Sequence, residues 1–415
     1  MTVPAPQSAG ASPAPGHRRS WSLAALLAAL SMLGPLSIDM YLPAFRAIEK
    51  EFDVPNLAVQ QTLSSYLFAY AFMMLWHGAL SDALGRRPIV LGGLALYGLA
   101  SLGCAIAGNI QSLWLFRTLQ GVTAGTGLVI GRAVIRDRFH GPEAQRLMSQ
   151  ITLVFGIAPA IAPILGGVFL NLLGWRSIFW VMLAFVIATL IWAARELPET
   201  LPADMRQPLH PRVMWRNYRA VFLHRHFLLL AGIPTLNFAA FFIYVASAPA
   251  YLESLGVTTW GFAWLFLPMI SGIMLGATLS GRLAGRLSPK RTVRLGYGFM
   301  FAGVAFNGLV VTLVPPGVPW HVLPLFVFAI GSSVVMPSVT LLLLDLFPRL
   351  RGLASSLQGF VQFLASGVIA GTIAPLLAQS LAALAAGMAV FTMASFALWL
   401  VYQRGVRSVR RPEPA

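Results

Sequence analysis

The sequence predicts an all-α integral membrane protein with twelve transmembrane helices in two bundles of six. Three observations lead to this prediction. The 415-residue chain is 57% hydrophobic and only 10% charged, whereas soluble domains average about 45–50% apolar and about 25% charged residues. Its apolar segments are long enough to cross a bilayer, which takes about 20 residues of helix. Its basic residues gather in alternate connections between these segments.

Each crossing segment is expected to be a helix, because lipid offers no hydrogen-bond partner to backbone N–H and C=O groups. Six segments precede a polar stretch that begins at residue 196, and six follow it. The predicted spans are 21–45, 57–78, 88–108, 112–132, 145–171, 175–195, 226–251, 260–282, 292–314, 320–345, 353–379 and 381–403.

Polar segments divide the chain into five parts. Residues 1–20 are rich in Pro, Ala and Ser and are expected to form a disordered cytoplasmic tail. The first bundle takes 21–195, and a cytoplasmic linker with prolines among its arginines takes 196–225. The second bundle takes 226–403, and a basic cytoplasmic tail takes 404–415.

The net charge of +16 indicates membrane topology and not nucleic-acid binding. Only Arg46, Lys50 and Arg176 lie in one set of connections, and Arg117 lies inside a span. All other basic residues lie in the tails, in the opposite loops or at the span ends that face them. Short loops rich in Lys and Arg stay in the cytoplasm, so both termini are expected there. The lone cysteine, Cys104, leaves no disulfide framework and no cysteine-based metal site.

The two halves repeat each other in sequence. Three short matches occur at similar spacings and in matching topological places, which indicates duplication. Parallel six-helix repeats with a site between them are a plan of secondary transporters. The matches pair 78–87 with 281–290, Asp137-Arg138-Phe139 with Asp345-Leu346-Phe347, and Pro43-Ala44-Phe45 with Pro249-Ala250-Tyr251.

Four motifs carry a resemblance to a known family. The loop after the second span matches the pattern G-x-L-x-D-x-x-G-R-[KR] of the major facilitator superfamily, and the whole set resembles its bicyclomycin-resistance (Bcr/CflA) drug:proton antiporters. The resemblance covers nearly all of 20–403. The motifs are Gly78-Ala-Leu-Ser-Asp82-Ala-Leu-Gly85-Arg86-Arg87, Arg117-x-x-Gln120-Gly121, Ala158-x-x-x-Ala162-Pro163-x-x-Gly166-Gly167 and Asp39-Met40-Tyr41-Leu42-Pro43-Ala44.

The resemblance implies the major facilitator fold and proton-driven efflux of small amphipathic drugs, such as bicyclomycin, chloramphenicol or sulfonamide-like compounds. Two bundles would give alternating access in a multi-pass protein of the bacterial inner membrane, expected to be a monomer. Its partners would be the drug, protons and the lipid bilayer, with a proton gradient as energy source and no cofactor. The alternatives are export of a metabolite (a sugar, amino acid or peptide) with incidental drug efflux, and a membrane-embedded enzyme or non-transporting sensor.

Asp39 and Arg117 are the candidate proton-coupling residues. Asp39 is the only carboxylate well inside a span of the first half, and intramembrane acids mark ion or substrate paths by default. Span 1 runs outward and span 4 inward, so a rise of about 1.5 Å per residue places both residues in the outer third. We therefore expect them to be partners. The alternatives are an acid that reaches the interface and an arginine that clamps backbone carbonyls.

A second group of candidates lies at the cytoplasmic span ends. The resemblance implies a charge network that latches the outward-open state, with Asp82 against the N-terminus of span 11, where the helix dipole favours an anion. The alternative is loop charges that only fix topology. The gating candidates are Gly78, Asp82, Gly85, Arg86, Arg87 and Asp137.

The antiporter-like motif of span 5 gives a small face on which another helix approaches closely. We expect it to bend span 5 against the opposite bundle and seal a leak, the alternative being ordinary packing. Its residues are Ala158, Ala162, Pro163, Gly166 and Gly167.

Aromatic and amide side chains form the candidate substrate pocket, because flat apolar pockets with few polar groups accept many ligands. No metal-ligand constellation is visible. The pocket candidates are Tyr41, Tyr66, Tyr70, Gln120, Asn237, Phe238, Phe241, Tyr244, Gln358 and Gln362.

Overall fold

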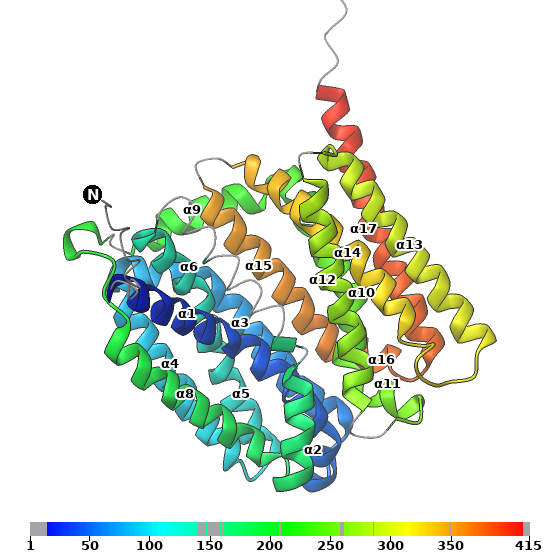
Figure 1. Cartoon of the computed structure of the whole chain (residues 1–415), viewed down its shortest axis with the longest axis horizontal. Helices are drawn as coiled ribbons and strands as arrows, with labels where there is room; N and C mark the ends of the chain where they lie inside the picture. The colour runs from blue at the N-terminus through cyan, green and yellow to red at the C-terminus, as the bar shows by residue number, and fades with distance from the viewer. Residues whose placement is uncertain are drawn as a thin grey trace, which may run out of the picture.

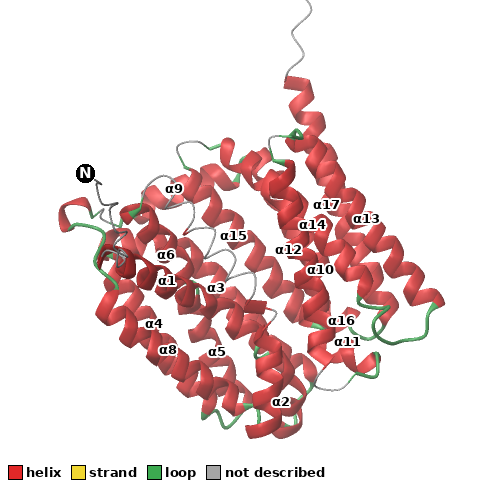
Figure 2. Ribbon diagram, in the orientation of Figure 1, coloured by secondary structure: helices red, strands yellow, loops and turns green. Residues whose placement is uncertain are grey.

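The protein is helical throughout its described part (Figures 1 and 2). This computed structural model describes residues 15–139, 147, 158–159, 161–206, 209–257, 261–284, 286–347 and 350–409, and these residues contain no strand. Within them, ten helices are long and apolar enough to cross a membrane. The predicted fold class, an all-α membrane protein, is confirmed.

The first half, blue to green in Figure 1, packs its long helices against one another, with α3 on α5, α4 on α8 and α1 on α6. Its elements are α1 (Pro15–Asp39), η1 (Leu42–Ala44), α2 (Phe45–Phe52), α3 (Asn56–Leu84), α4 (Arg86–Ala105), α5 (Ile110–Ala124), α6 (Thr126–Arg138), an apolar helix at Ile161–Leu173 and α8 (Arg176–Glu196).

The connection and the second half follow in green to red. In the second half α13 and α12 pack on α14, and α10 packs on α17. The elements are η2 (Ala203–Met205), α9 (Pro211–Phe222), α10 (Arg225–Ala246), α11 (Ala248–Ser254), α12 (Phe262–Leu283), α13 (Pro289–Leu313), α14 (Leu323–Asp345), α15 (Arg351–Val368), the π-helical turn η4 (Ile369–Ile373), α16 (Ala374–Leu377) and α17 (Leu381–Val409).

The predicted span 112–132 is not one continuous helix. α5 ends at Ala124 and α6 begins at Thr126. The imidazole of His77, which is buried on α3, donates from Nε2 to the Val122 carbonyl oxygen at 3.0 Å. A side chain that inserts among the backbone hydrogen bonds of a helix interrupts the helix. The bond from His77 to the Val122 carbonyl therefore accounts for the break at Gly125.

Two other predicted spans end early in short helices. α1 stops at Asp39 and α10 at Ala246, and η1 and α11 follow them. Pro43 and Pro249 each lie in the first turn of these short helices, where a missing N–H costs little. The last residues of these two predicted spans therefore form separate short helices.

The predicted tails and linker also differ in detail from the structure. Of the predicted tail 1–20, residues 15–20 are already helical in α1, and α17 continues to Val409, beyond the predicted end of the last span. The linker contains α9, whose Tyr218 hydroxyl donates to the Leu75 carbonyl oxygen of α3 at 2.6 Å. Much of the predicted span 145–171 lies outside the described residues.

The two halves meet along α3 and α15. The Ser64 hydroxyl of α3 donates to the Gly367 carbonyl oxygen of α15 at 2.5 Å. A Cβ on Gly367 would lie 2.8 Å from Phe68, and one on Gly359 would lie 2.7 Å from Met74. Glycines on α15 thus let the helices of the two halves approach closely.

Candidate functional site

Arg117 lies in the interior of the first half, enclosed by two aromatic rings. Its side chain is on α5 and is fully buried. The guanidinium carbon lies 4.5 Å from the ring centroid of Tyr41 and 4.5 Å from that of Tyr66. A desolvated cation on a ring face gains about 2 kcal/mol. These rings therefore offset part of the cost of burying a charge that cannot be neutralised.

A chain of hydrogen bonds leads from Arg117 to α4. Arg117 Nη1 donates to Gln120 Oε1 at 2.8 Å, and Gln120 Nε2 donates to Ser101 Oγ at 2.8 Å. The Ser101 hydroxyl donates to the Tyr97 carbonyl oxygen at 2.9 Å. Arg117 Nε and Nη2 have no hydrogen-bond partner among the described residues. The guanidinium therefore keeps two donors that could take an anionic or carbonyl group.

Asp39 does not pair with Arg117, contrary to the expected contact. It ends α1, is 5% exposed, and makes no side-chain hydrogen bond or ion pair with any described residue. Tyr41, two residues later, faces the guanidinium instead. Tyr41 lies in the turn between α1 and η1, and its ring occupies one face of the guanidinium. Among the described residues, the Asp39 carboxylate has no hydrogen-bond or ion-pair partner.

Glycine allows the arginine helix to lie so close to α3. A Cβ on Gly121 would be 2.2 Å from the Tyr66 carbonyl oxygen, far inside contact distance. Tyr66 in turn donates its hydroxyl to the Gly34 carbonyl oxygen of α1 at 3.3 Å. In the Arg117-x-x-Gln120-Gly121 motif, Gly121 thus allows close helix packing, and Arg117 and Gln120 form a buried hydrogen bond.

The antiporter-like motif packs within the first half where it is described. A Cβ on Gly166 would be 2.2 Å from the Met40 carbonyl oxygen, which follows α1. Ala158 and Ala162 are fully buried, and Pro163 and Gly167 are buried beside them. For Gly166 this arrangement matches the alternative of ordinary packing. The predicted contact of this motif with the opposite bundle stays a prediction.

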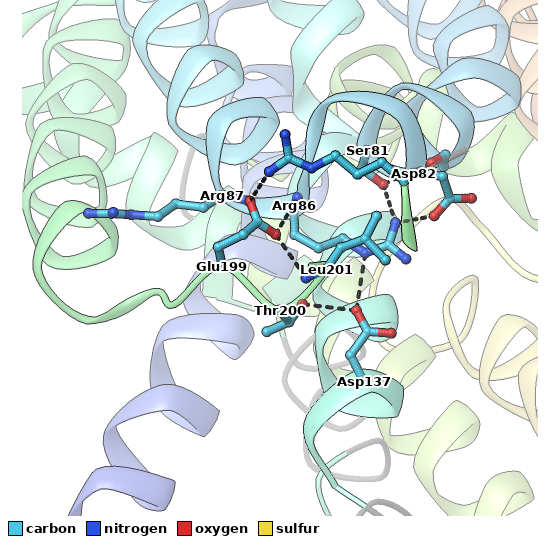
Figure 3. A network of polar contacts seen from close by, with 10 residues as sticks. Ser81, Asp82, Arg86, Arg87, Asp137, Glu199, Thr200 and Leu201 are labelled. Atoms are coloured by element: carbon cyan, nitrogen blue, oxygen red, sulfur yellow. Dashed lines mark hydrogen bonds and ion pairs between the residues drawn. The ribbon is translucent and has the colours of Figure 1, made fainter. Parts of the chain in front are cut away.

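Figure 3 shows a second charged cluster, at the linker end of the first half. Arg86, at the start of α4, donates from Nε to Asp137 Oδ2 at 3.2 Å and from Nη1 to Ser81 Oγ at 2.6 Å. Nη1 also pairs with Asp82. The side chain of Arg86 is 9% exposed and that of Asp82 is 48% exposed. Three of the predicted gating residues, from α3, α4 and α6, therefore form one network.

The predicted gating residues Gly85, Gly78 and Arg87 lie around this network. Gly85 has φ 101°, a conformation that favours glycine. Gly78 contributes its carbonyl oxygen, which accepts from the Ser81 hydroxyl at 2.8 Å. Arg87 turns its side chain to the Ala194 carbonyl oxygen at 2.7 Å. Gly85 thus allows the turn between α3 and α4, and the hydrogen bond from Arg87 joins this turn to α8.

Glu199 is a member of the network that the sequence did not reveal. Its carboxylate accepts the backbone N–H groups of Arg86 at 3.0 Å and Arg87 at 3.3 Å, which are free donors at the start of a helix. Thr200 next to it donates to Asp137 Oδ2 at 2.9 Å. The only signal was an acid directly after Pro198 at the end of a span. The first residues of the predicted linker are therefore bound to the first half.

The remaining pocket candidates are divided between the interface and the interior of the second half. Tyr70 packs its ring 4.4 Å from that of Phe363 on α15, at the interface between the halves. Gln358 on α15 donates to Thr340 of α14 at 3.2 Å, and Gln362 lies one turn further along α15. Tyr244 accepts a hydrogen bond from Asn307 at 2.6 Å. The buried side chain of Asn237 has no hydrogen-bond partner among the described residues. The ring centroids of Phe238 and Phe241 lie 6.2 Å apart.

Comparison with known proteins gives a consistent result. Residues 27–370 match the Major Facilitator Superfamily. A bicyclomycin resistance protein homolog of Haemophilus influenzae is 30% identical over 84% of this chain and 87% of its own. Multidrug resistance protein D of Escherichia coli is 27% identical over 85% of this chain and 89% of its own.

The fold also matches solved transporters. A bacterial homolog of the human lysosomal transporter Spinster, in an inward-facing and occupied conformation, superposes with a TM-score of 0.72 and 16% sequence identity. The match covers 98% of this chain and 100% of that one. At this identity the match supports the fold alone.

We predict that Gly121→Ala destabilises the protein by about 1–3 kcal/mol or more, because the added Cβ must displace backbone of α3. Gly92→Ala is the matched control, since its Cβ would meet no atom within 4 Å, and Ala is the better helix former. Thermal unfolding in detergent measures both. Equal midpoints for the two variants would contradict the close approach of α5 and α3.

Proposed function

The chain belongs to the Major Facilitator Superfamily, and on that premise we propose that it exports small amphipathic drugs in exchange for protons. The observation that carries the coupling is Asp39, an acid buried in the bundle that has no partner among the described residues. An ionised carboxylate in such surroundings costs several kcal/mol, so binding and release of a proton change its free energy strongly. The drug class rests on the relatives, which are named as bicyclomycin and multidrug resistance proteins.

The separation of Asp39 from Arg117 supports a switch between two arrangements. In the described conformation Arg117 is held by Tyr41, Tyr66 and Gln120, and no described basic residue pairs with Asp39. A rotation of the end of α1 that brought Asp39 toward the free donors of Arg117 would favour the ionised acid. Proton release would then accompany that movement, and proton binding would accompany its reversal.

We infer that the linker end faces the cytoplasm. Figure 1 shows α9 and the end of α17 on one side of the molecule, with α2 and α11 on the opposite side. The basic residues of the linker and of the C-terminal tail belong to the α9 side, and short basic loops stay in the cytoplasm. In a bacterial inner membrane, α2 and α11 would then face outward, and both termini would be cytoplasmic.

The substrate is proposed to bind between the halves, beside the aromatic residues of α3. Tyr70 and Phe363 meet across the interface of α3 and α15, and Gln358, also on α15, is buried and donates to Thr340 of α14. Aromatic faces with a few amide groups accept ligands of varied shape. One such surface would serve several drugs.

The cluster around Arg86 is proposed to act as a latch at the cytoplasmic end. Asp82 is its most exposed carboxylate, at 48%, and is therefore free to leave Arg86 when the halves move. The first turn of α15 has no side-chain cap, so its N–H groups and dipole would favour Asp82 as a new partner. Formation of this contact would favour the outward-open state.

Transport in proteoliposomes tests the proposed function. Purified protein should accumulate a labelled drug against its concentration gradient only while a proton gradient is imposed, and a protonophore should stop it. An equal accumulation of drug with and without the protonophore would contradict proton coupling. Accumulation of a sugar, amino acid or peptide with no transport of any drug would favour a metabolite exporter instead.

We predict that Asp39→Asn abolishes uphill drug transport but leaves drug binding, because Asn keeps the shape and cannot release a proton. Asp53→Asn is the matched control, since Asp53 is exposed and its left-handed conformation suits Asn. Both are compared by uphill transport in proteoliposomes. Normal uphill transport by Asp39→Asn would exclude Asp39 as the proton site.

We predict that Arg117→Lys lowers transport at least about ten-fold, because the ammonium loses the planar stacking between two rings. Arg117→Ala should be inactive. Arg294→Lys on α13, where the arginine is exposed, is the control and should transport normally. If Arg117→Lys matches the unmodified protein, the residue acts as a point charge only.

A further inference from the structure

Two short helices from the two halves meet at the end of the molecule opposite to the linker. η1 carries Pro43 and Ala44, and α11 carries the corresponding residues of the repeat, Pro249 and Ala250. These two elements contact each other. Leu42 and Ala44 of η1 are fully buried. The repeated segments thus form an apolar contact between the halves.

An ion pair lies beside this contact. Arg46, in the first turn of α2, places Nη2 2.5 Å from Glu253 Oε2 on α11. On its own helix Arg46 also binds Glu49, 3.2 Å between Nη1 and Oε2. Glu49 is held in turn by Asn56 Nδ2 at 3.2 Å. Glu49 and Asn56 of the first half therefore orient the Arg46 side chain, which pairs with Glu253 of the second half.

The neighbouring charged residues at this end of the molecule form an ion pair within the first half. Arg176 at the start of α8 pairs with Glu51 of α2, and Trp175 donates to the same carboxylate at 2.6 Å. Both elements of that pair belong to the first half. The pair of Arg46 with Glu253 crosses from one half to the other, so only it is broken when the halves separate at this end.

We propose that Arg46 and Glu253 form the outer gate of the transport cycle, positioning residues that hold the outward end closed. The inference rests on the proposed function in one respect, that the halves alternate between two states. The side chains are 50% and 66% exposed, so water replaces the bond readily on opening. An exposed ion pair changes a two-state ratio by about two- to five-fold, which suits a contact that must open in every cycle.

This gate differs from the cytoplasmic cluster. There, Arg86, Asp82 and Asp137 are bound to one another within the first half. At the outer end, one charge comes from each half. The closed outer state therefore gains from Arg46 and Glu253 directly, and neutralisation of either residue shifts the population toward the outward-open state.

Cysteine labelling tests the gate without any need for transport. Ser64→Cys in a Cys104→Ala background reports opening, because Ser64 is 5% exposed and lies between α3 and α15. Arg46→Gln or Glu253→Gln should speed its reaction with a small thiol reagent by about two- to five-fold. Arg46→Lys, which keeps the positive charge beside Glu49 and Glu253, should retain the slow rate. Glu51→Gln, which breaks the pair within one half, should leave the rate unchanged.

Three results would overturn the gate: unchanged labelling in both Gln variants, a rate in Arg46→Lys as fast as in Arg46→Gln, or an equal increase in Glu51→Gln. The last would indicate general loosening of this end. Because labelling needs neither drug nor proton gradient, a failure of drug efflux in proteoliposomes leaves the labelling result intact. The two proposals are therefore tested separately.

Discussion

The burial of the Arg117 cation is the constraint around which the first half is built. A guanidinium keeps its charge in any protein, and lipid offers it no hydration. The bundle supplies two aromatic faces, from Tyr41 and Tyr66, and one hydrogen bond, to Gln120. These partners come from the turn after α1, from α3 and from α5. They converge on one point because Gly121 lets α5 lie against the backbone of α3. Two guanidinium nitrogens have no hydrogen-bond partner among the described residues, and Asp39, a buried acid at the end of α1, could accept from them in another state.

The contact between the halves depends on apolar packing and not on a buried charge. Along α3 and α15 it depends on glycines of α15 that face large apolar side chains of α3 and on the ring contact of Tyr70 with Phe363. Among the described residues one hydrogen bond, from Ser64, joins these two helices. Such an interface slides or parts at small cost, since it buries few polar groups. Charges are kept to its two ends, where water can replace them. An ion pair crosses the halves at the end opposite to the linker, and a cluster of Arg86 with two carboxylates lies at the linker end.

Much of the fold and part of the site could be predicted from the sequence. Apolar length predicted membrane-crossing helices, and ten of the described helices are long and apolar enough to cross. The charge network that the family resemblance implied unites Asp82, Arg86 and Asp137 in the structure. Glu199 was missed, since an acid that binds backbone N–H groups carries no side-chain motif. The break at Gly125 was missed because it depends on His77, which is distant in sequence. The expected pairing of Asp39 with Arg117 followed from depth alone. Depth does not determine which face of α1 a side chain takes.

Proton release on drug binding is the most direct test of coupling through Asp39. The purified protein is placed in detergent with a weak buffer and a pH indicator, and a transported drug is added. Coupling through Asp39 predicts that drug binding releases protons from the unmodified protein and none from Asp39→Asn, although both bind the drug. Equal release from the two proteins, or binding without release in the unmodified protein, would contradict it.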